Sequence, residues 1–316
     1  MAEAEALVAD EVRKQYGDAV ALDGVSLSVP EGEVFGLVGP NGAGKTTLVR
    51  ALTGTTPCEG TVRVLGAPPG DVDPARVGLL PQSFHPADRL TARELIAYYA
   101  GLYDETRTVG AVLDDVGLAD AADTWYENLS GGQQRRACVG TALVNDPDVL
   151  FLDEPTTGID PAGRRSLWTL VEDLAAGGTT VLLTSHSMAE VERLADRVGL
   201  LRDGRLVAVG TPAALIADHG GDSHLLVDVG PDVDPAALST TLDADVTARD
   251  GRLVVRNVAL ADVGSVVADL EAHGVDIDSF TWAEPDLEDV YLRLTGEALG
   301  PTGAAAPVAA GEEGER

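Results

Sequence analysis

A glycine-rich stretch, GPNGAGKT at residues 39–46, fits the pattern G-x-x-x-x-G-K-[ST]. It follows a short apolar run and precedes a helical pattern that stops at Gly54. In such a loop, backbone N–H groups wrap the β-phosphate of a nucleotide, the lysine reaches the β and γ oxygens, and the next hydroxyl coordinates Mg²⁺. We therefore predict a nucleotide site in which Lys45 also serves catalysis and Thr46 is a metal ligand. The predicted binding residues of this loop are Gly39, Pro40, Asn41, Gly42, Ala43, Gly44, Lys45, Thr46 and Thr47.

Two adjacent carboxylates follow a second apolar run, VLFLD at residues 149–153. Asp153 ends that run, where it can hold Mg²⁺ through water. Glu154 comes next, where it can polarise an attacking water as a general base. Such a pair is sometimes only a solvated turn, but after a buried strand and with a phosphate loop in the same chain it favours a hydrolytic site. We predict that Asp153 is a metal ligand and Glu154 the catalytic base.

Three further side chains complete the predicted site. His186 follows an apolar run, so we expect it at the carboxyl edge of the same sheet, in contact with the γ-phosphate and active in catalysis. Gln82 follows another strand pattern, and its amide can join the Mg²⁺ and catalytic water shell when its loop moves inward. Tyr16 offers a face on which adenine can stack, although an aromatic residue at a turn is more often a packing residue.

A second anion-binding pattern occurs in ENLSGGQQRR, residues 127–136. Ser130 can cap a helix that begins here, and Gly131 and Gly132 let a ligand approach the backbone. A helix N-terminus carries partial positive charge and unpaired N–H groups, which suit a phosphate. Because the glycine loop already supplies one phosphate site, the residues alone leave open which nucleotide the second site holds.

The elements that must position these residues alternate between strand and helix. The predicted buried strands lie at 33–39, 149–153 and 179–185, and an amphipathic helix lies at 161–178. This alternation predicts an α/β fold with a mostly parallel sheet covered on both faces. We also predict an antiparallel β portion within residues 6–38 and a helix-rich segment within residues 90–124.

A break at HGGDSH, residues 219–224, precedes a different pattern of elements. The order strand, helix, strand, strand, helix, strand predicts a small ferredoxin-like α+β domain with a hairpin turn at residues 250–251. A last helix is predicted after this domain pattern. We predict a nucleotide-binding domain at 1–220, a C-terminal domain at 221–296 and a disordered tail at 297–316.

The chain is strongly acidic. Among its 316 residues, 52 are Asp or Glu and 22 are Lys or Arg, which gives a formal net charge of −30, and only Lys14 and Lys45 are lysines. Such a field repels nucleic acid, so we expect no nucleic-acid partner. The composition resembles halophilic proteins of salt-loaded cytoplasms. The two cysteines form no disulfide or metal pattern, no apolar stretch is long enough to cross a bilayer, and the N-terminus lacks the features of a signal peptide.

In chain order, Tyr16, the glycine loop, Gln82, LSGGQ, LFLDE and His186 resemble the nucleotide-binding subunit of an ABC transporter over about residues 6–220. The resemblance implies a RecA-like P-loop NTPase core with an antiparallel β subdomain and a helical subdomain that carries the signature LSGGQ. It also implies that Asp160 lies in a loop that crosses to a partner cassette. The signature residues that would close on the ATP of that partner are Ser130, Gly131, Gly132 and Gln133.

Flanking stretches, TSHSMAEVERLADRV and EPDLEDVYLRLTG, resemble the ATPases of drug-exporter-type ABC systems of the daunorubicin-resistance kind. This resemblance implies a homodimer that uses ATP and Mg²⁺ to power a separate membrane permease, at the cytoplasmic face of the membrane. The C-terminal domain would then regulate or support the dimer. The alternatives are a soluble ABC ATPase of translation or DNA repair and a small-molecule kinase, which would leave LSGGQ unexplained.

Overall fold

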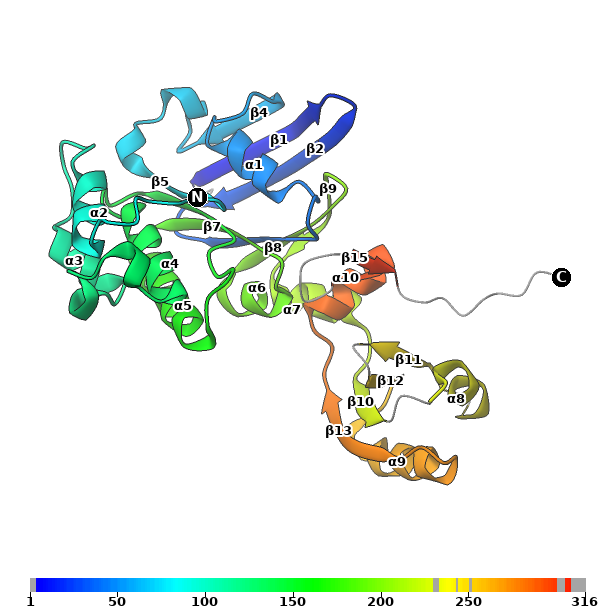
Figure 1. Ribbon diagram of the computed structural model, residues 1–316. Coiled ribbons are helices and arrows are strands. Elements are labelled where there is room, and N and C mark those ends of the chain that lie inside the picture. Colours follow the sequence, from blue (N-terminus) through cyan, green and yellow to red (C-terminus); the bar gives the residue numbers. More distant parts are fainter. Residues whose placement is uncertain (1–3, 230–232, 243, 250–251, 300–304, 308–316) are drawn as a thin grey trace. The chain divides into compact units, whose positions relative to one another are not determined.

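The computed structural model describes residues 4–229, 233–242, 244–249, 252–299 and 305–307 (Figure 1). Contacts within the chain divide it into two compact units, with the boundary between Pro212 and Ala213. The sequence predicts a boundary at residue 220, at the glycine-rich break. In the structure the turn η5 (Ile216–Gly220) belongs to the second unit, because helix α10 (Leu287–Thr295) packs against it.

The first unit is built on a six-stranded sheet of order β5-β6-β7-β3-β8-β9. Neighbouring strands pair in parallel except for β8 and β9, which form an antiparallel hairpin at one edge. The strands are β3 (Val34–Val38), β5 (Val77–Leu80), β6 (Val149–Asp153), β7 (Thr180–Ser185), β8 (Arg197–Arg202) and β9 (Arg205–Gly210). Every residue of β3, β6 and β7 is buried, which explains their largely apolar sequences.

Helices follow the central strands and cover the sheet. Helix α1 (Lys45–Leu52) follows β3, α5 (Pro161–Ala176) follows β6, and α6 (Met188–Leu194) follows β7. Helix α6 approaches the sheet so closely that a Cβ on Gly36 would lie 2.1 Å from Cγ1 of Val191. The parallel α/β core predicted from the sequence is therefore confirmed.

A second sheet, of order β2-β1-β4, is antiparallel. Its strands are β1 (Glu5–Tyr16), β2 (Ala19–Pro30) and β4 (Glu59–Val64). Apolar residues of β1 and β2, such as Leu7 and Leu22, share one buried core with Leu48 and Leu52 of α1. This sheet is the predicted antiparallel β portion, and it lies beside α1 in Figure 1.

The helical portion of the first unit contains α2 (Ala92–Ala100), α3 (Val109–Asp115) and α4 (Gly131–Thr141). Thr91 and Glu94 form a capping box that starts α2. Gly140 of α4 permits close packing, because a Cβ there would lie 3.1 Å from Ile96 of α2 and 3.3 Å from Val112 of α3. Short 3-10 turns occur at Pro69–Asp71, Pro74–Arg76, Ala119–Ala121 and Tyr126–Asn128.

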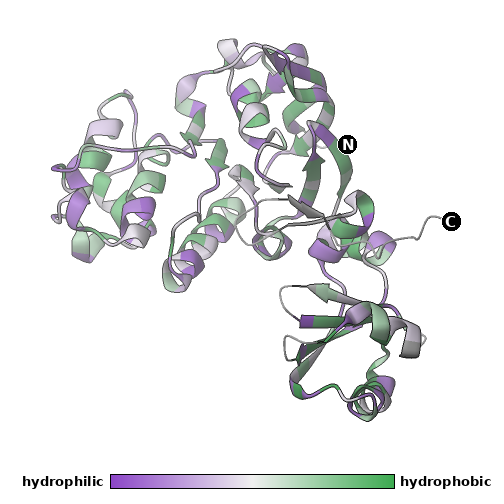
Figure 2. Cartoon of the chain, turned by 45° about the vertical axis from the view of Figure 1, so that its right-hand side comes forward, coloured by the Kyte–Doolittle hydropathy of each residue, from purple (hydrophilic) through white to green (hydrophobic). Residues whose placement is uncertain are grey.

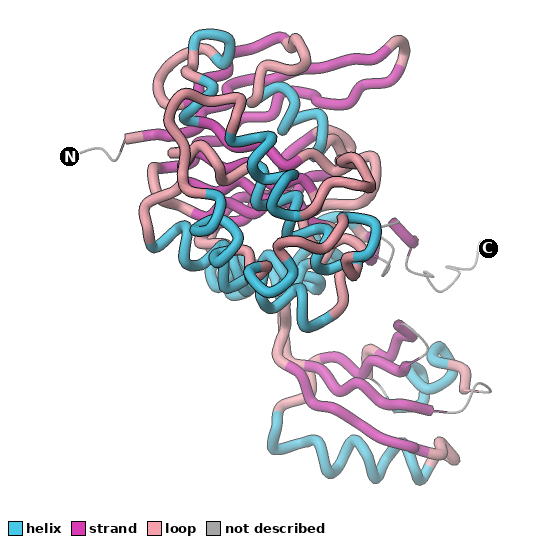
Figure 3. Tube along the Cα trace, turned by 60° about the vertical axis from the view of Figure 1, so that its left-hand side comes forward, coloured by secondary structure: helices cyan, strands magenta, loops and turns pink. Residues whose placement is uncertain are grey.

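The second unit contains a four-stranded antiparallel sheet of order β11-β12-β10-β13. The elements are α7 (Pro212–Leu215), which begins at the boundary, β10 (His224–Val229), α8 (Pro235–Leu242), β11 (Val246–Arg249), β12 (Arg252–Arg256), the turn Leu260–Asp262, α9 (Val263–Ala272) and β13 (Ile277–Ala283). The elements β10, α8, β11, β12, α9 and β13 give the predicted strand-helix-strand-strand-helix-strand order and a confirmed ferredoxin-like arrangement, and α10 is the predicted last helix after it. Figure 3 shows the helices beside this sheet.

The core of the second unit is apolar and self-contained. Leu225, Val227, Leu253 and Val255 from the sheet pack with Leu270 of α9, and the hydrophobic colouring follows these strands in Figure 2. The predicted hairpin turn at residues 250–251 lies outside the described residues.

The segment after α10 differs from the tail without structure that the sequence predicts. Two short strands, β14 (Glu297–Leu299) and β15 (Ala305–Pro307), pair with each other, and the other residues beyond position 299 lie outside the described ones. Both cysteines are free thiols. Within the described part of the chain, no helix is long and apolar enough to cross a membrane.

Candidate nucleotide-binding site

The glycine loop joins β3 to α1, and two of its glycines are required by close backbone contacts. Gly44 has a φ of 111°, and a Cβ on it would lie 2.4 Å from the carbonyl oxygen of Ala21. A Cβ on Gly39 would lie 2.2 Å from the carbonyl oxygen of Leu201. Gly44 is also the N-cap of α1, and no side chain of the described residues caps this helix. The first N–H groups of α1 are therefore available to an anion.

Lys45 is the buried cation of this loop, with 5% of its surface exposed. Its Nζ donates to the carbonyl oxygens of Gly39 at 2.7 Å and Pro40 at 3.1 Å. It also lies 3.6 Å from Oε1 of Glu154. Burial lowers the pKa of the Lys45 ammonium, and the charge of Glu154 opposes that shift. An ammonium with so few water contacts is suited to exchange its present partners for phosphate oxygens.

Glu154 is the point at which the predicted catalytic side chains meet. Its Oε2 accepts a hydrogen bond from Nε2 of Gln82 at 3.0 Å and one from Oγ1 of Thr157 at 3.4 Å. Nδ1 of His186 lies 3.9 Å from the same oxygen. Residues that are far apart in the sequence thus surround one carboxylate, at the carboxyl edge of the parallel sheet.

A cavity of about 470 Å³ opens over this carboxylate. Its lining includes Lys45, Thr46 and Thr47 from the glycine loop and helix α1, together with Gln82, Glu154 and His186. A smaller cavity of about 210 Å³ has Thr46, Gln82 and Asp153 in its lining, which are the three predicted metal ligands. A hydroxyl, an amide and one carboxylate suit Mg²⁺, because Mg²⁺ keeps several waters and takes its other ligands from substrate phosphates. The residues present therefore fit a Mg²⁺-nucleotide.

The backbone at Glu154 has an unusual conformation. Its φ is 49°, in the left-handed region that residues other than glycine seldom adopt. Its N–H donates to Thr184 on β7, to the carbonyl oxygen at 3.2 Å and to Oγ1 at 3.0 Å. Thr184 Oγ1 in turn donates to Oδ1 of Asp153 at 2.5 Å. On the other side, the guanidinium of Arg135 donates to the carbonyl oxygens of this segment. Arg135 and Thr184 are absent from the residues that the sequence predicts for the site.

A buried carboxylate, Glu190, connects the two loops that carry Glu154 and His186. It is 1% exposed and accepts hydrogen bonds from the hydroxyls of Thr156 at 2.9 Å and Ser185 at 2.6 Å. It also accepts one from Nε1 of Trp168 at 3.0 Å. The sequence does not single out Glu190, because nothing in its spacing distinguishes it from the neighbouring Glu192 in the same short helix.

Tyr16, at the end of β1, is 45% exposed and does not belong to the lining of the 470 Å³ cavity. The Lys14 ammonium lies 5.0 Å from the centre of its ring. Hydrogen bonds with Thr56 and, more weakly, with Thr47 lower the pKa of the Tyr16 phenol. Since Thr47 does line the cavity, Tyr16 borders the nucleotide site with an accessible aromatic face.

The signature residues form a different environment. Ser130 and Gln133 close a capping box on α4, in which Oγ of Ser130 accepts from the N–H of Gln133 at 3.3 Å and Oε1 of Gln133 accepts from the N–H of Ser130 at 3.0 Å. Gly132 packs against the loop before α5, where its Cβ would lie 2.9 Å from Oδ1 of Asp160. The structure thus brings Gly132 and Asp160 together, and neither belongs to the lining of the 470 Å³ cavity.

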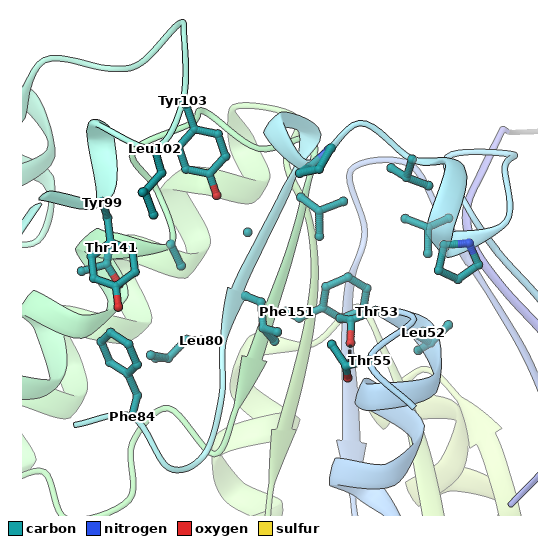
Figure 4. A pocket seen from close by; sticks show the side chains of 18 residues that line it. Leu52, Thr53, Thr55, Leu80, Phe84, Tyr99, Leu102, Tyr103, Thr141 and Phe151 are labelled. Atoms are coloured by element: carbon teal, nitrogen blue, oxygen red, sulfur yellow. Dashed lines mark hydrogen bonds between the residues drawn. The ribbon is translucent and has the colours of Figure 1, made fainter. Parts of the chain in front are cut away.

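Another cavity, of about 340 Å³, is largely apolar (Figure 4). Phe84, two residues after Gln82, packs edge-to-face with Tyr99 of α2, with ring centres 5.7 Å apart and an interplanar angle of 67°. Leu102 also lines this cavity and is 62% exposed, and the nearby Tyr98 is 61% exposed. A cavity of this kind, bordered by exposed apolar side chains, is typical of a protein-binding surface.

The parallel α/β core, the glycine loop and the acidic pair at the sheet edge define a P-loop ATPase. The family described as ABC transporter matches residues 22–157. The Nod factor export ATP-binding protein I of Paraburkholderia xenovorans (strain LB400) is 40% identical over 299 residues, which cover 92% of this chain and 97% of that protein. The linearmycin resistance ATP-binding protein LnrL of Bacillus subtilis (strain 168) is 36% identical over 93% of this chain and 99% of its own length.

Solved structures agree with these sequence relatives. An ATP-binding cassette of an ABC transporter in its ADP conformation is 27% identical, with a TM-score of 0.60 over 68% of this chain and 94% of that chain. A nucleotide-free cassette from an ABC transporter gives a TM-score of 0.59 at 27% identity, over 66% of this chain and 91% of that one. The chain belongs to the family of ABC transporter ATP-binding proteins.

Membership of this family confirms several predictions. The chain is an ATPase that uses ATP with Mg²⁺, and it works with a second cassette and a separate permease. The relatives match along nearly their whole length and are named as ATP-binding proteins of Nod factor export and of linearmycin resistance. A soluble ATPase of translation or DNA repair, or a small-molecule kinase, does not fit these relatives.

Proposed function

We propose that two copies of this chain form two ATP sites between them and drive export through a separate permease. The observation that carries this proposal is the meeting of Lys45, Gln82 and His186 around Glu154, while the signature of the same chain is absent from that cavity's lining. One half of each site is then supplied by one copy and the other half by its partner.

In each site, Lys45 and the first N–H groups of α1 bind the phosphates of ATP. When phosphate oxygens replace the present partners of Lys45, the Glu154 carboxylate loses its nearby ammonium and becomes free to accept a proton from water. Gln82 and His186, which lie beside Glu154, orient that water and the γ-phosphate. When bound, Mg²⁺ would neutralise phosphate charge. Thr46 and Gln82 would hold the ion, and Asp153 would hold it through water.

Adenine stacks on the accessible face of Tyr16 in this proposal. The partner's signature completes the binding site around the γ-phosphate, through Ser130, Gly131, Gly132 and Gln133. Asp160 lies in the loop that packs against Gly132. A phosphate that approaches α4 would find the positive end of an eleven-residue helix.

The apolar cavity beside Gln82 is the proposed contact with the permease. Phe84 and Tyr99 line it, and the exposed Leu102 and Tyr98 border it. Because Gln82 and Phe84 lie in one loop, a helix of the permease seated here would be coupled to the side chain that touches Glu154. This contact would hold the chain at the cytoplasmic face of the membrane. Export as the direction of transport is supported by the relatives named for export and resistance.

The number of copies that form an active site can be tested on the purified chain. We expect Mg²⁺-dependent ATP hydrolysis that EDTA abolishes, and a specific activity that rises with protein concentration as monomers assemble. The control is Glu154→Gln, which should show no activity at any concentration. A specific activity that stays constant while light scattering reports only monomer would contradict sites shared between two copies.

A further inference from the structure

Arg135 connects the signature helix to the catalytic segment of its own chain. It lies in the second turn of α4, which begins at Gly131. Its Nε donates to the carbonyl oxygen of Pro155 at 2.9 Å, and its Nη2 donates to those of Asp153 and Glu154 at 3.0 Å each. One guanidinium therefore binds three consecutive carbonyls, those of Asp153, which ends β6 and is the predicted metal ligand, of Glu154, the predicted base, and of Pro155.

These three bonds matter because the segment is not in a relaxed conformation. A residue other than glycine is strained at the φ of Glu154, and such a conformation persists only where the surroundings hold it. The N–H of Glu154 is held by Thr184 of β7, and its carbonyl oxygen is held by Arg135 of α4. The direction in which the Glu154 side chain leaves the backbone therefore depends on the position of α4.

The first turn of the same helix is the signature. Ser130 and Gln133 form its capping box, and Arg135 follows Gln133 by two positions in the same regular helix. A phosphate that binds at the start of α4 would compete for the N–H groups of this box and shift the helix as a rigid body. Since Arg135 binds the carbonyl oxygens of residues 153–155, such a shift of α4 changes the position of the Glu154 side chain.

We propose that Arg135 is a positioning residue that couples the two ATP sites of the dimer. When the partner's ATP binds at the signature of a chain, Arg135 of that chain transmits the change to Glu154 of the same chain. This inference rests on the proposed function, in which the signature serves the partner's nucleotide and Glu154 serves its own. Arg135 itself contacts neither the cavity over Glu154 nor the proposed phosphates.

The next residue along the helix is a matched control. Arg136 is also partly buried, and its Nη1 donates to two backbone carbonyl oxygens, of Val116 at 2.9 Å and of Gly117 at 2.8 Å. These carbonyls lie at the end of α3, far in the chain from the catalytic segment. Replacing either arginine removes a guanidinium from α4 together with its hydrogen bonds to backbone carbonyl oxygens, but only Arg135 touches the segment that carries Glu154.

The first experiment compares Arg135→Met with Arg136→Met in the full chain, by steady-state ATPase assay and by titration with a fluorescent ATP analogue. We expect Arg135→Met to lower kcat by about tenfold or more, because a small misplacement of a base is costly, and to leave nucleotide affinity unchanged. Its Hill coefficient for ATP should fall to about 1 from a higher wild-type value. Arg136→Met should keep kcat and the Hill coefficient of the folded protein. Equal effects of both changes on kcat would overturn the inference.

Arg135→Lys serves as the milder variant if Arg135→Met does not fold. A lysine still donates to carbonyl oxygens but lacks the planar fork that reaches three of them. The kcat of Arg135→Lys should therefore be lower than that of wild type and higher than that of Arg135→Met, or higher than zero if Arg135→Met does not fold. Full wild-type kcat and cooperativity in Arg135→Lys would also overturn the inference, since an ammonium cannot reproduce the fork.

A mixed dimer shows on which chain Arg135 acts. One copy carries Glu154→Gln, so the remaining active site uses Glu154 of the other copy and the signature of the Glu154→Gln copy. Arg135→Met is then placed on one copy or the other, and two affinity tags isolate each mixed dimer. We expect loss of activity when Arg135→Met is on the copy with intact Glu154, and retention when it is on the Glu154→Gln copy. The reverse pattern would mean that Arg135 serves only the signature.

The outcomes also separate this inference from the proposed function. If wild-type specific activity does not depend on dimer formation, the shared sites fail and the coupling fails with them. If wild-type activity requires the dimer and the two arginine variants behave alike, only the role of Arg135 fails.

Discussion

Two helices of the first unit begin with glycine-rich turns, and their N-termini differ in what surrounds them. Helix α1 has Gly44 as its N-cap residue and no side-chain cap, and it begins at the buried Lys45 beside a cavity that Glu154 also lines. Helix α4 has Ser130 as its N-cap residue, whose side chain forms a closed capping box with Gln133 in an exposed turn. The first N-terminus has donors that no side chain caps in a preformed pocket, whereas the second pairs the N–H groups of Ser130 and Gln133 with its own side chains.

The difference indicates how the two sites are used. A phosphate at α1 gains N–H donors and a buried cation from one chain, so that chain alone suffices for binding. A phosphate at α4 meets a capping box that already pairs two N–H groups, and the signature residues do not line the cavity over Glu154 of the same chain. The second N-terminus is therefore suited to a nucleotide that arrives already bound to another copy.

Glu154→Gln should have the largest effect on this comparison, because it removes chemistry from the α1 site and keeps both phosphate-binding turns. Turnover should fall on the order of 10²-fold or more, as for loss of a general base, while ATP binding remains. Unhydrolysed ATP should hold two copies together, so light scattering with Mg-ATP should report a dimer. Hydrolysis at the wild-type rate would remove Glu154 from its proposed role.

Complementation between two inactive variants tests which copy each N-terminus serves. Lys45→Ala breaks the α1 site, and Gly131→Asp places a carboxylate at the start of α4, where it repels an incoming phosphate. Gly131 is preferable to Gly132, because its Cβ would meet only the carbonyl oxygen of Gly158 at an ordinary 3.5 Å. Each homodimer should be inactive, and mixing should restore measurable activity, up to about half of wild type for independent sites and less where the two sites are coupled through Arg135.

The mixing experiment needs high salt, because two chains of net charge −30 repel each other. Circular dichroism should first show that both variants fold. If the mixed dimer forms and stays inactive, an α4 site that acts on the partner's nucleotide is not supported unless both sites must be filled together. Full activity of Gly131→Asp on its own would exclude a phosphate at α4.

Ser130→Ala sharpens the comparison by removing the cap of α4 alone. Loss of an N-cap costs about 0.5–2 kcal/mol, so Tm should fall by a few degrees. Thr91→Ala removes the equivalent cap of α2 and is the control, since that capping box has no proposed contact with nucleotide. We expect similar losses of Tm in both variants and a loss of ATPase activity only in Ser130→Ala. Equal ATPase losses would reduce Ser130 to a structural cap.

The smallest effect is expected from removing the second unit. A chain that ends at residue 212 keeps every residue around the 470 Å³ cavity, and the core of the second unit is formed by its own residues. Its affinity for a fluorescent ATP analogue should equal that of the full chain. A shortened chain that folds, as judged by circular dichroism, and binds no nucleotide would show that the α1 site is not complete within the first unit. Whether the second unit regulates or supports the dimer can then be read from the assembly of the shortened chain.

The sequence predicts most of the fold because the relevant signals are local. Apolar runs that end in glycine or in an acidic residue predict β3 and β6. The glycines of the loop predict positions where a Cβ would not fit, and the close contacts at Gly39 and Gly44 agree with this. Side chains that act at a sheet edge are also predictable, since the carboxyl ends of parallel strands meet there. This is why Gln82, Glu154 and His186 are found together.

Contacts that depend on packing could not be predicted from the sequence in this way. Arg135 and Arg136 are adjacent residues of one type, and only the orientation of α4 decides that one reaches the catalytic segment and the other reaches α3. From the sequence, Glu190 would be taken for an exposed acidic residue. In the structure it is buried, with hydrogen bonds from the indole of Trp168 and from two hydroxyls. The unit boundary lies before the glycine-rich break for a similar reason, because α10 packs on residues just ahead of it.

The scarcity of lysine gives the molecule a convenient covalent handle. Lys45 is buried with its ammonium on backbone carbonyls, whereas Lys14 is partly accessible and lies against the ring of Tyr16. Among side chains, an amine-directed fluorophore added under mild conditions should therefore attach selectively to Lys14. The dye on Lys14 would then sit beside the proposed adenine-stacking face, and its emission would report nucleotide arrival without any engineered residue.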